Sequence, residues 1–272
     1  MSASAVEKPL AGRGAVVTGG GRGIGAAIAH ALAASGAAVV VSARTAAEIE
    51  AVAAALRAAG ANAWAVPADV TDETSVKALG AEVRRLLAAS GRAVDILVNN
   101  AGDAVSAPLA KVTLAEWNRI LTVNATGTFL CTREFASAMA ARGRGRIVNI
   151  ASTAGLAGGK YISHYAAAKH AVVGFTRAIA LELGARGVTV NAICPGYVAT
   201  PLTERTIENI RARTGLDRAE AVAAVLRTTG QARLISPEEV AAAAVRLCLD
   251  EAAAVTGQAI ILDGGTGGTV PR

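Results

Sequence analysis

The sequence predicts an α/β fold built on a doubly wound parallel sheet with helices on both faces. Short apolar runs of buried-strand type alternate with longer, Ala-rich segments of helical type, as a parallel sheet requires. A Gly-rich turn joins the first strand run to the first helical segment. The chain of 272 residues contains no internal repeat and no linker, so we expect a single domain over residues 1–272.

The first unit consists of a strand run over residues 15–18, a Gly-rich turn and a helix over about residues 26–34. Strand, Gly-rich turn and helix in this order are the context that a dinucleotide-binding turn requires. Glycines let the backbone approach a pyrophosphate closely, and a helix N-terminus presents unpaired N–H groups to its oxygens. The alternative is a Gly-rich turn without a ligand. The candidate contacts in this turn are Gly19, Gly21, Arg22, Gly23, Ile24 and Gly25.

The residues after the second strand run, 38–42, favour one dinucleotide over the other. An Asp or Glu near this position commonly binds the ribose 2′-OH of NAD, whereas this chain has Arg44. A guanidinium can bind a 2′-phosphate through two hydrogen bonds, and Arg22 could reach the same phosphate. We therefore expect NADPH, with NAD as the alternative if Arg44 is a solvated surface residue. Glu48 fits a capping box with Thr45.

The remaining elements continue the alternation of strands and helices. Strands are expected over residues 63–66, 94–98, 146–151, 188–193 and 259–262. Helices are expected over residues 46–59, 72–89 and 113–141, and a further helix carries Tyr165 and Lys169. Small and amide residues just past the carboxyl ends of such strands lie where ligands bind. In this chain Asn100, Ala101 and Gly102 are of this kind, and Asp69, Val70 and Ser152 occupy corresponding places after other strands. The carboxylate of Asp69 could meet the amino group of an adenine.

Tyr165 and Lys169 stand four residues apart, a spacing that puts both side chains on one helix face, one turn apart. An ammonium about 4 Å from a phenol favours the phenolate by roughly 4 kcal/mol at an effective dielectric of about 20. That interaction would lower the pKa of Tyr165 from about 10 toward neutrality, where a proton donor works best. Ser152 adds a hydroxyl that can hold an oxygen beside the phenol. The alternative is a packed ring with a snorkelling Lys neighbour.

The segment after the sixth strand leaves the strand–helix pattern. Pro195 and Gly196 break that strand, and residues 203–229 form a polar, basic excursion. We expect one or two helices here, which act as a mobile substrate lid over about residues 200–230. Ser236 then begins the next helix as an N-cap, with Pro237 at the first helical position and Glu239 at the third, as in a capping box.

Composition narrows the classes of partner that the chain can have. Hydrophobic residues make up 53% of the chain and charged residues 18%, which permits a substantial core and argues against disorder. The net charge of +6 suits an anionic cofactor or substrate. The Arg residues are scattered and aromatic residues make up only 3%, which argues against a nucleic-acid-binding surface.

No segment indicates export, membrane insertion or a metal site. The most apolar stretch, residues 26–43, contains His30, Ser35 and Ser42 and fits a helix, a turn and a buried strand better than a membrane span. Residues 1–12 lack the apolar core of a signal peptide, and we expect them to form an N-terminal extension. The three Cys residues lie far apart, without CxxC or His pairing. We therefore expect a cytoplasmic protein with reduced cysteines and no metal.

Together these motifs resemble the classical short-chain dehydrogenase/reductase family over nearly the whole chain, from about Gly14 to Gly265. They occur in the family's order and spacing as Thr18-Gly19-x-x-x-Gly23-x-Gly25, Asn99-Asn100-Ala101-Gly102, Asn124, Ser152, Tyr165-x-x-x-Lys169 and Pro195-Gly196. Residues 164–170 and 194–198 are also similar to ketoreductases that act on 3-oxoacyl thioesters, including aromatic polyketide ketoreductases. Many alcohol and steroid dehydrogenases share such stretches.

The resemblance implies a Rossmann-like sheet of seven strands, a four-residue catalytic set and a homodimer or homotetramer. By that analogy Tyr165 donates a proton to a carbonyl oxygen, and Ser152 orients that oxygen. Lys169 lowers the pKa of Tyr165 and holds the nicotinamide ribose, while Asn124 anchors a water on the proton path. The cofactor contacts carry over to Gly19, Gly21, Arg22, Gly23, Ile24, Gly25, Arg44, Asp69, Val70, Asn100, Ala101, Gly102, Tyr165, Lys169, Pro195, Gly196, Val198 and Thr200.

The function that we expect is NADPH-dependent reduction of a ketone to a secondary alcohol, with a 3-oxoacyl thioester on CoA or a carrier protein as the favoured substrate. Basic side chains of the lid would meet the phosphates of CoA or an acidic carrier, or they form a solvated helix face: Arg205, Arg211, Arg213 and Arg218. The alternative enzyme is an NAD-dependent secondary-alcohol or 3-hydroxyacyl-CoA dehydrogenase. A remote alternative is a dinucleotide-binding sensor that performs no chemistry.

Overall fold

The strands form one sheet in the order β3-β2-β1-β4-β5-β6-β7, and every neighbouring pair runs parallel. The structure is a computed structural model that describes residues 8–265. The strand bounds are β1 Gly14–Thr18, β2 Ala38–Ala43, β3 Ala63–Pro67, β4 Val94–Asn99, β5 Gly145–Ile150, β6 Val188–Pro195 and β7 Ala259–Leu262. The sheet and its strand order confirm the predicted doubly wound, Rossmann-like fold.

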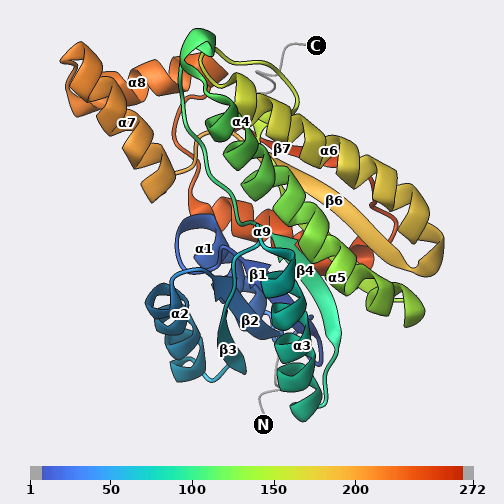
Figure 1. Cartoon of the computed structure of the whole chain (residues 1–272). Coiled ribbons are helices and arrows are strands. Elements are labelled where there is room, and N and C mark those ends of the chain that lie inside the picture. Colours follow the sequence, from blue (N-terminus) through green and yellow to red (C-terminus); the bar gives the residue numbers. More distant parts are fainter. Residues whose placement is uncertain (1–7, 266–272) are drawn as a thin grey trace.

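Helices cover both faces of this sheet (Figure 1). Their bounds are α1 Gly23–Ala34, α2 Ala46–Ala58, α3 Glu73–Ala89, α4 Leu114–Leu121, α5 Gly127–Ala141, α6 Ser163–Leu183, α7 Pro201–Thr214, α8 Arg218–Thr229 and α9 Pro237–Cys248. Side chains of α1, α2 and α9 pack with one set of strand residues, and side chains of α3, α5 and α6 pack with the alternate set. Within β1, for example, Val17 belongs to the first core and Val16 to the second, as the two-residue period of a strand requires.

The strand order reverses between β1 and β4, which are hydrogen-bonded neighbours although two strands separate them in sequence. From β1 the chain continues to β2, its neighbour toward one end of the sheet, whereas from β4 it continues to β5, its neighbour toward the other end. In open parallel sheets such a switch point leaves a crevice at the carboxyl ends of the strands. The Gly-rich turn after β1 and the loop after β4 therefore meet at the same edge.

The helix predicted over residues 113–141 is one continuous helical run with an irregular centre. Thr122–Thr126 between α4 and α5 forms a π-helical turn that carries Asn124. A π-helical turn holds more residues than an α-helical turn, so the side chains after it point in another direction. Such π-bulges are common at functional sites. The sequence pattern predicted the helix but not this turn.

Helix capping shows one success and one failure of sequence interpretation. Ser236 caps α9 in a full capping box with Glu239, as predicted. Thr45 occupies the N-cap position of α2, but its side chain accepts no capping hydrogen bond. Glu48 binds the Arg22 guanidinium instead, at 3.1 Å from Oε1 to Nη1. The predicted capping box of Thr45 and Glu48 is therefore wrong, because a partner distant in sequence takes the carboxylate.

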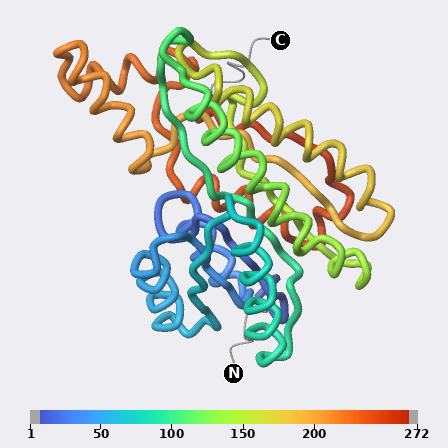
Figure 2. The backbone as a smooth tube through the Cα atoms, viewed as in Figure 1, coloured from blue at the N-terminus to red at the C-terminus, as the bar shows by residue number. Residues whose placement is uncertain are grey.

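Helices α7 and α8 project from one corner of the sheet, as the tube in Figure 2 shows. They are the two helices of the predicted excursion, and we call them the lid, residues 201–229. The two segments that enter and leave the lid are joined side by side: the Ala199 N–H donates to the Ile235 carbonyl at 2.8 Å. The Gln231 side chain adds a bond from the Tyr197 N–H at 2.7 Å. The base of the lid is thus fixed to the body.

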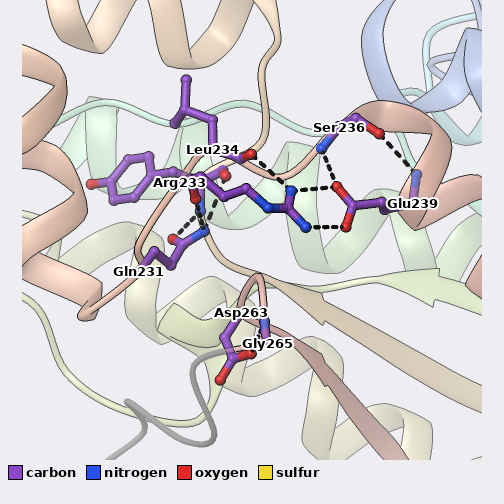
Figure 3. Close-up of polar contacts among 8 residues, drawn as sticks. Gln231, Arg233, Leu234, Ser236, Glu239, Asp263 and Gly265 are labelled. Atoms are coloured by element: carbon purple, nitrogen blue, oxygen red, sulfur yellow. Dashed lines mark hydrogen bonds and ion pairs between the residues drawn. The ribbon is translucent and has the colours of Figure 1, made fainter. Parts of the chain in front are cut away.

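The segment that leaves the lid is held on its other side as well (Figure 3). The two terminal nitrogens of the Arg233 guanidinium, Nη1 and Nη2, each donate to the Glu239 carboxylate at 2.7 Å. The same carboxylate accepts from the Ser236 N–H at 2.8 Å, which ties the segment to the first turn of α9. These bonds anchor the return segment directly beside β7.

Residues 1–7 of the predicted N-terminal extension lie outside the described residues. Within the rest of that extension, Leu10 is fully buried in the core and its N–H donates to the Ser35 carbonyl at 2.8 Å. Among the described residues, no helix combines the length and the hydrophobicity that a bilayer crossing needs. In the same part of the chain, no cluster of three or more His, Cys, Asp or Glu side chains is arranged to hold a metal ion.

Candidate active site

A cleft of about 720 Å³ lies along the carboxyl edge of the sheet. It brings together nearly all site residues that the sequence predicted, from both sides of the switch point. Those lining it are Gly19, Gly21, Arg22, Gly23, Ile24, Arg44, Asp69, Val70, Asn100, Ala101, Gly102, Asn124, Ser152, Tyr165, Lys169, Pro195, Gly196, Val198 and Thr200. Gly25 alone of the predicted set does not line the cleft.

Gly25 has a packing position behind the turn. A Cβ at this residue would lie 2.3 Å from the Gly19 carbonyl oxygen and 2.4 Å from the Asn100 amide nitrogen. The absence of a side chain therefore lets α1 approach the turn. Asn100 in turn donates to the carbonyls of Thr18 and Gly19 at 3.0 and 2.9 Å, which holds the turn against the end of β4.

The N-terminus of α1 opens into the cleft without local competition. Its N-cap residue, Arg22, makes no side-chain capping bond, and the first turn contains no acidic residue. The first N–H groups and the helix dipole are therefore available to an anionic group. Gly19 just before it has a φ of +62°, and a Cβ there would lie 2.8 Å from the Ala101 Cα. The turn is a cradle that only a backbone without side chains can form.

Ser152 and Tyr165 meet at the floor of the cleft. Ser152 follows β5 and is the N-cap of a short 3₁₀ turn, where its Oγ accepts from the Ala154 N–H at 3.1 Å. Its hydroxyl also lies near the Tyr165 phenol and acts to lower the pKa of that phenol. Tyr165 lies in the first turn of α6, which places the ring beside the end of β5. Two hydroxyl groups thus converge on one point at the reaction end of the cleft.

Lys169 lies one turn after Tyr165, as the spacing predicted. Its Nζ is 5.7 Å from the centroid of the Tyr165 ring and donates to the Ile150 carbonyl at 2.8 Å. The residue is 5% exposed, and burial lowers the pKa of its ammonium to about 8. This amine therefore loses its charge at a pH well below that of an exposed Lys.

The pKa of Tyr165 does not follow the prediction from its spacing to Lys169. Burial of the phenol raises its pKa to about 12, and the nearby Ser152 hydroxyl acts in the opposite direction. Neighbouring acidic groups, Asp103 among them, add to the increase. The expected decrease toward neutrality is therefore wrong for this structure, because desolvation raises the pKa more than the Ser152 hydroxyl lowers it.

Asn124 is turned toward the cleft by the π-helical turn. Its amide nitrogen donates to the carbonyls of Ile120 and Asp103, at 2.9 and 2.8 Å. Its Oδ1 is buried and has no hydrogen-bond partner among the described residues. A Cβ on Gly102 would lie 2.6 Å from that oxygen and 3.6 Å from the Lys169 Nζ. A buried acceptor without a partner indicates a position for a ligand group or a water.

The opposite end of the cleft is charged and open. The Arg22 and Glu48 side chains are 60% and 36% exposed and form the ion pair described above. Burial alone would raise the pKa of Asp69, but hydrogen bonds from Thr71 and the charge of Arg44 together lower it. The Thr71 N–H and hydroxyl donate to one Asp69 oxygen at 2.9 and 2.7 Å. Both guanidinium groups at this end thus have a carboxylate neighbour.

Sequence interpretation missed Asp103 and Arg119 at the mouth of the cleft and placed Arg205 there only as a basic residue of the lid. Asp103, Arg119 and Arg205 line it together, and the Asp103 carboxylate binds both guanidinium groups. The position of Asp103 directly after the Asn99–Gly102 stretch was a signal, since that edge of the sheet binds ligands. Its partner Arg205 lies 102 positions away, and no local pattern connects the two.

The basic residues of the lid are mostly paired with carboxylates. Arg211 binds Glu208 at 2.8 Å within α7, and Arg218 binds Glu204 at 2.9 Å between α8 and α7. These pairs favour the solvated-face interpretation of the lid's Arg residues over a surface reserved for phosphates. Arg205 differs because its partner belongs to the body of the protein.

A sheet with this switch point, a glycine cradle and a Tyr–Lys pair at one edge defines a nucleotide-dependent oxidoreductase. The chain matches the family model described as short chain dehydrogenase over residues 13–211. It therefore belongs to the short-chain dehydrogenase/reductase family, as its motifs predicted, and is an NAD(P)-dependent oxidoreductase of the ketoreductase type.

Relatives and solved structures agree with this assignment. The chain is 41% identical to the short-chain reductase protein NovJ of Streptomyces niveus, over 92% of each chain. It is 42% identical to the 3-oxoacyl-[acyl-carrier-protein] reductase of Synechocystis, over 92% of this chain and 95% of that one. A crystal structure of actinorhodin polyketide ketoreductase with NADPH matches with a TM-score of 0.87 and 39% identity, over 94% and 97% of the two chains.

The residues of the cleft fit a nicotinamide dinucleotide on three observations of this structure. Gly19 lets the turn lie against Ala101, where any Cβ would clash with the backbone, and the α1 N-terminus has no capping side chain. The buried Asn124 Oδ1 lacks a partner among the described residues. The cradle and the helix suit a pyrophosphate. The polar groups near Lys169 suit the ribose and ring at the other end.

Proposed function

We propose that this protein reduces a ketone to a secondary alcohol with NADPH, and that its favoured substrate is a 3-oxoacyl thioester on CoA or a carrier protein. The observation that carries the proposal is the convergence of Ser152, Tyr165 and Lys169 on one end of the cleft, with Lys169 one helical turn after Tyr165. The relatives named as a 3-oxoacyl-carrier-protein reductase and a polyketide ketoreductase support the thioester.

In this proposal the bound nicotinamide supplies the hydride that adds to the carbonyl carbon. Tyr165 donates its phenolic proton to the carbonyl oxygen, so that the C=O bond becomes an alcohol C–O–H. Ser152 donates a hydrogen bond to the same oxygen and fixes its position. Lys169 holds the ribose hydroxyls, and Asn124 anchors a water through which the Tyr165 proton is replaced.

The raised pKa of Tyr165 supports the reductive direction. A phenol with a pKa of about 12 is fully protonated at neutral pH. The protonated form that reduction uses is therefore the resting form, whereas oxidation of an alcohol would need the phenolate as a base. The same high pKa makes the phenol a weaker proton donor than one with a pKa near neutrality.

NADPH is supported by two guanidinium groups at the open end of the cleft. Arg44 directly follows β2, and Arg22 lies in the turn opposite. A 2′-phosphate between them would receive charge-assisted hydrogen bonds from both. The other predicted contacts keep their assignments in this proposal, with Asp69 and Val70 at the adenine and Val198 and Thr200 near the carboxamide or phosphates.

The test is steady-state turnover of acetoacetyl-CoA by the full-length protein with NADPH and, in parallel, NADH. We expect rapid loss of NADPH absorbance and a preference for NADPH of at least tenfold in kcat/KM. Bound NADPH without turnover of this substrate or of simple ketones would contradict the proposal, and would favour a dinucleotide-binding sensor.

A second candidate is an NAD-dependent secondary-alcohol or 3-hydroxyacyl-CoA dehydrogenase. One observation favours it: Arg22 is bound by Glu48, and Arg44 faces Asp69, so carboxylates already compete for both guanidinium groups. The same assay separates the two, because this candidate predicts faster oxidation of 3-hydroxybutyryl-CoA with NAD than reduction of acetoacetyl-CoA with NADPH.

We also propose that the whole chain is one catalytic unit of a homodimer or homotetramer, in which the lid covers the substrate. Apolar side chains exposed on α4, α5 and α6 support an assembly: Leu114, Phe129 and Leu181 are 73%, 40% and 86% exposed. Light scattering on the purified protein measures the mass, and a monomer at assay concentration would contradict this part.

A further inference from the structure

Three contacts from different parts of the fold converge on Asp103, in the loop after β4. Its Oδ2 accepts from the Arg119 Nη1 of α4 at 2.9 Å. Its Oδ1 accepts from the Arg205 Nη2 of α7 at 3.0 Å. Its backbone carbonyl accepts from the Asn124 amide at 2.8 Å. One residue thus touches the lid, the helix before the π-helical turn and a predicted catalytic side chain.

The bond to Arg205 differs from every other ion pair of the lid in the described residues. Arg211–Glu208 joins two residues of α7, and Arg218–Glu204 joins α8 to α7. Both pairs remain intact however the lid moves as a body. Among the ion pairs within residues 8–265, Arg205–Asp103 alone connects a lid helix to the body of the protein.

Apolar packing does not join α7 to the sheet cores, so the ion pair of Arg205 with Asp103 is the contact that holds α7 over the cleft. The buried side chains of the lid form a small cluster of their own, made by Ile207, Ala221 and Val225 with partly buried neighbours from the lid and its base. This cluster is separate from the two cores on the sheet. The base of the lid is fixed at Ala199 and Ile235, so the lid can tilt about that base.

We propose that Asp103 is a positioning residue that clamps the lid over the cleft and links lid closure to the reaction end. The clamp consists of Asp103, Arg119 and Arg205, all of which line the cleft. The role in catalysis rests on the proposed function, since Asp103 itself touches Asn124 and not the reacting atoms. The contacts of Asp103 with Arg119 and Arg205 do not depend on the proposed function.

Arg119 makes the clamp selective for a closed lid. It binds Oδ2 of the carboxylate, which leaves Oδ1 to accept from Arg205 of α7. The Asp103 side chain is 30% exposed, which leaves the pair partly shielded from salt. When the lid tilts away, Arg205 leaves and Arg119 keeps the carboxylate in place, so closure needs no reorientation of Asp103.

The electrostatic effect of Asp103 reaches the proton donor. Its negative charge contributes to the raised pKa of Tyr165, and its carbonyl fixes the amide of Asn124, whose Oδ1 faces Gly102 and the Lys169 amine. A displacement of this loop would therefore change both groups together. The clamp gives the lid a physical route to the reaction end through one backbone segment.

Hydrogen exchange of the full-length protein, without any substrate, tests the clamp directly. Asp103→Asn removes one charge of the pair with nearly unchanged side-chain shape, and Arg205→Gln removes the other charge with a shorter polar side chain. We expect amide exchange in α7 to become about fivefold faster in either variant, the upper range for a partly exposed ion pair. The double variant should be no faster than the faster single variant, because the two changes break the same bond.

The matched controls are Glu208→Gln and Arg211→Gln. They remove an ion pair of similar length on the same helix, but one that does not reach the body. We expect exchange in α7 to stay within about twofold of the unmodified protein. Arg205→Lys, which keeps the positive charge, should restore more than half of the protection that Arg205→Gln loses.

A kinetic readout separates positioning from general loss of structure. With a substrate that the enzyme reduces, Arg205→Gln should raise KM about fivefold and leave kcat within about twofold, since an open lid weakens binding. Unchanged α7 exchange in both Asp103→Asn and Arg205→Gln would overturn the clamp, whatever the turnover. If no ketone is reduced by the unmodified protein, the proposed function fails and the exchange data alone decide the clamp.

Discussion

At one end of the cleft, Asn124 and Lys169 are 1% and 5% exposed, whereas at the other the Arg22 and Glu48 side chains are 60% and 36% exposed. We call the first the buried end, which also holds Ser152 and Tyr165. The second, the open end, is formed by charged side chains with carboxylate and guanidinium neighbours. The same cleft thus combines a desolvated site with a solvated one.

The difference shows how the two ends obtain their effects. At the buried end, desolvation moves pKa values strongly and the Lys169 ammonium and the Asn124 amide nitrogen have fixed partners, so a single change affects the reaction severely. At the open end, water and salt screen the charges, so each change alters selectivity by a smaller factor. We therefore expect chemistry to depend on the first end and cofactor choice on the second.

The largest effect is expected from Tyr165→Phe at the buried end. Removal of the phenolic proton should lower kcat about 10³-fold, the typical contribution of a general acid. NADPH affinity, measured by fluorescence titration, should change by less than about threefold, because the ring remains. Turnover within tenfold of the unmodified enzyme would remove Tyr165 from the role of proton donor.

The pH dependence of reduction tests the buried end next. Burial lowers the pKa of Lys169 to about 8, so its positive charge is present below that pH and lost as the pH rises through it. Tyr165, with a pKa of about 12, stays protonated throughout this range. We expect kcat/KM for the ketone to be flat near pH 7 and to fall about tenfold per unit above pH 8.

Enzyme held at pH 9 and assayed again at pH 7 is the control for unfolding in this experiment. A rate that stays constant up to pH 10 would show that the Lys169 charge plays no part in reduction. A rate that rises with pH would indicate instead that the phenolate form of Tyr165 is required.

An intermediate effect is expected from Arg44→Asp at the open end. The change removes a charge-assisted donor and places a carboxylate where a ribose 2′-OH would lie. The ratio of kcat/KM for NADPH over NADH should fall by about 10- to 100-fold, with kcat for the preferred cofactor within about threefold. Arg85→Asp, on the exposed surface of α3 and paired with Glu82, is the matched control. An unaltered NADPH preference would remove Arg44 from the phosphate site.

The smallest effect is expected from Glu48→Gln, which releases Arg22 from its ion pair. Because exposed pairs contribute about 0.2–1 kcal/mol, NADPH should bind about two- to fivefold more tightly at low ionic strength. NADH affinity should not change, and the gain should vanish in high salt. Glu82→Gln, in the pair with Arg85, is the control. Weaker NADPH binding in Glu48→Gln would mean that the carboxylate supports the cofactor rather than competing with it.

The sequence predicted those features that depend on local pattern. The apolar run over Ala259–Leu262 is β7 with the same bounds, and Ser236 caps α9 in the predicted box with Glu239. The Gly-rich turn and the Tyr165–Lys169 spacing located the cleft, because parallel strands deliver their carboxyl ends to one edge.

What the sequence could not predict depends on partners that are distant along the chain or on burial. Glu48 accepts a hydrogen bond from Arg22, 26 positions earlier, instead of forming a capping box with Thr45. Asp103 takes Arg205, 102 positions later. The spacing of Tyr165 and Lys169 gives their distance but not the desolvation that raises one pKa and lowers the other.

The separability of the two ends is the central claim, and the Tyr165→Phe/Arg44→Asp double variant tests it most directly. Cofactor affinities by titration and kcat by turnover would be measured for both single variants and the double variant. We predict that the double variant combines the binding preference of Arg44→Asp with the low kcat of Tyr165→Phe, each within about twofold, because independent sites act additively in free energy. A cofactor preference that depends on whether Tyr165 is present would contradict the account.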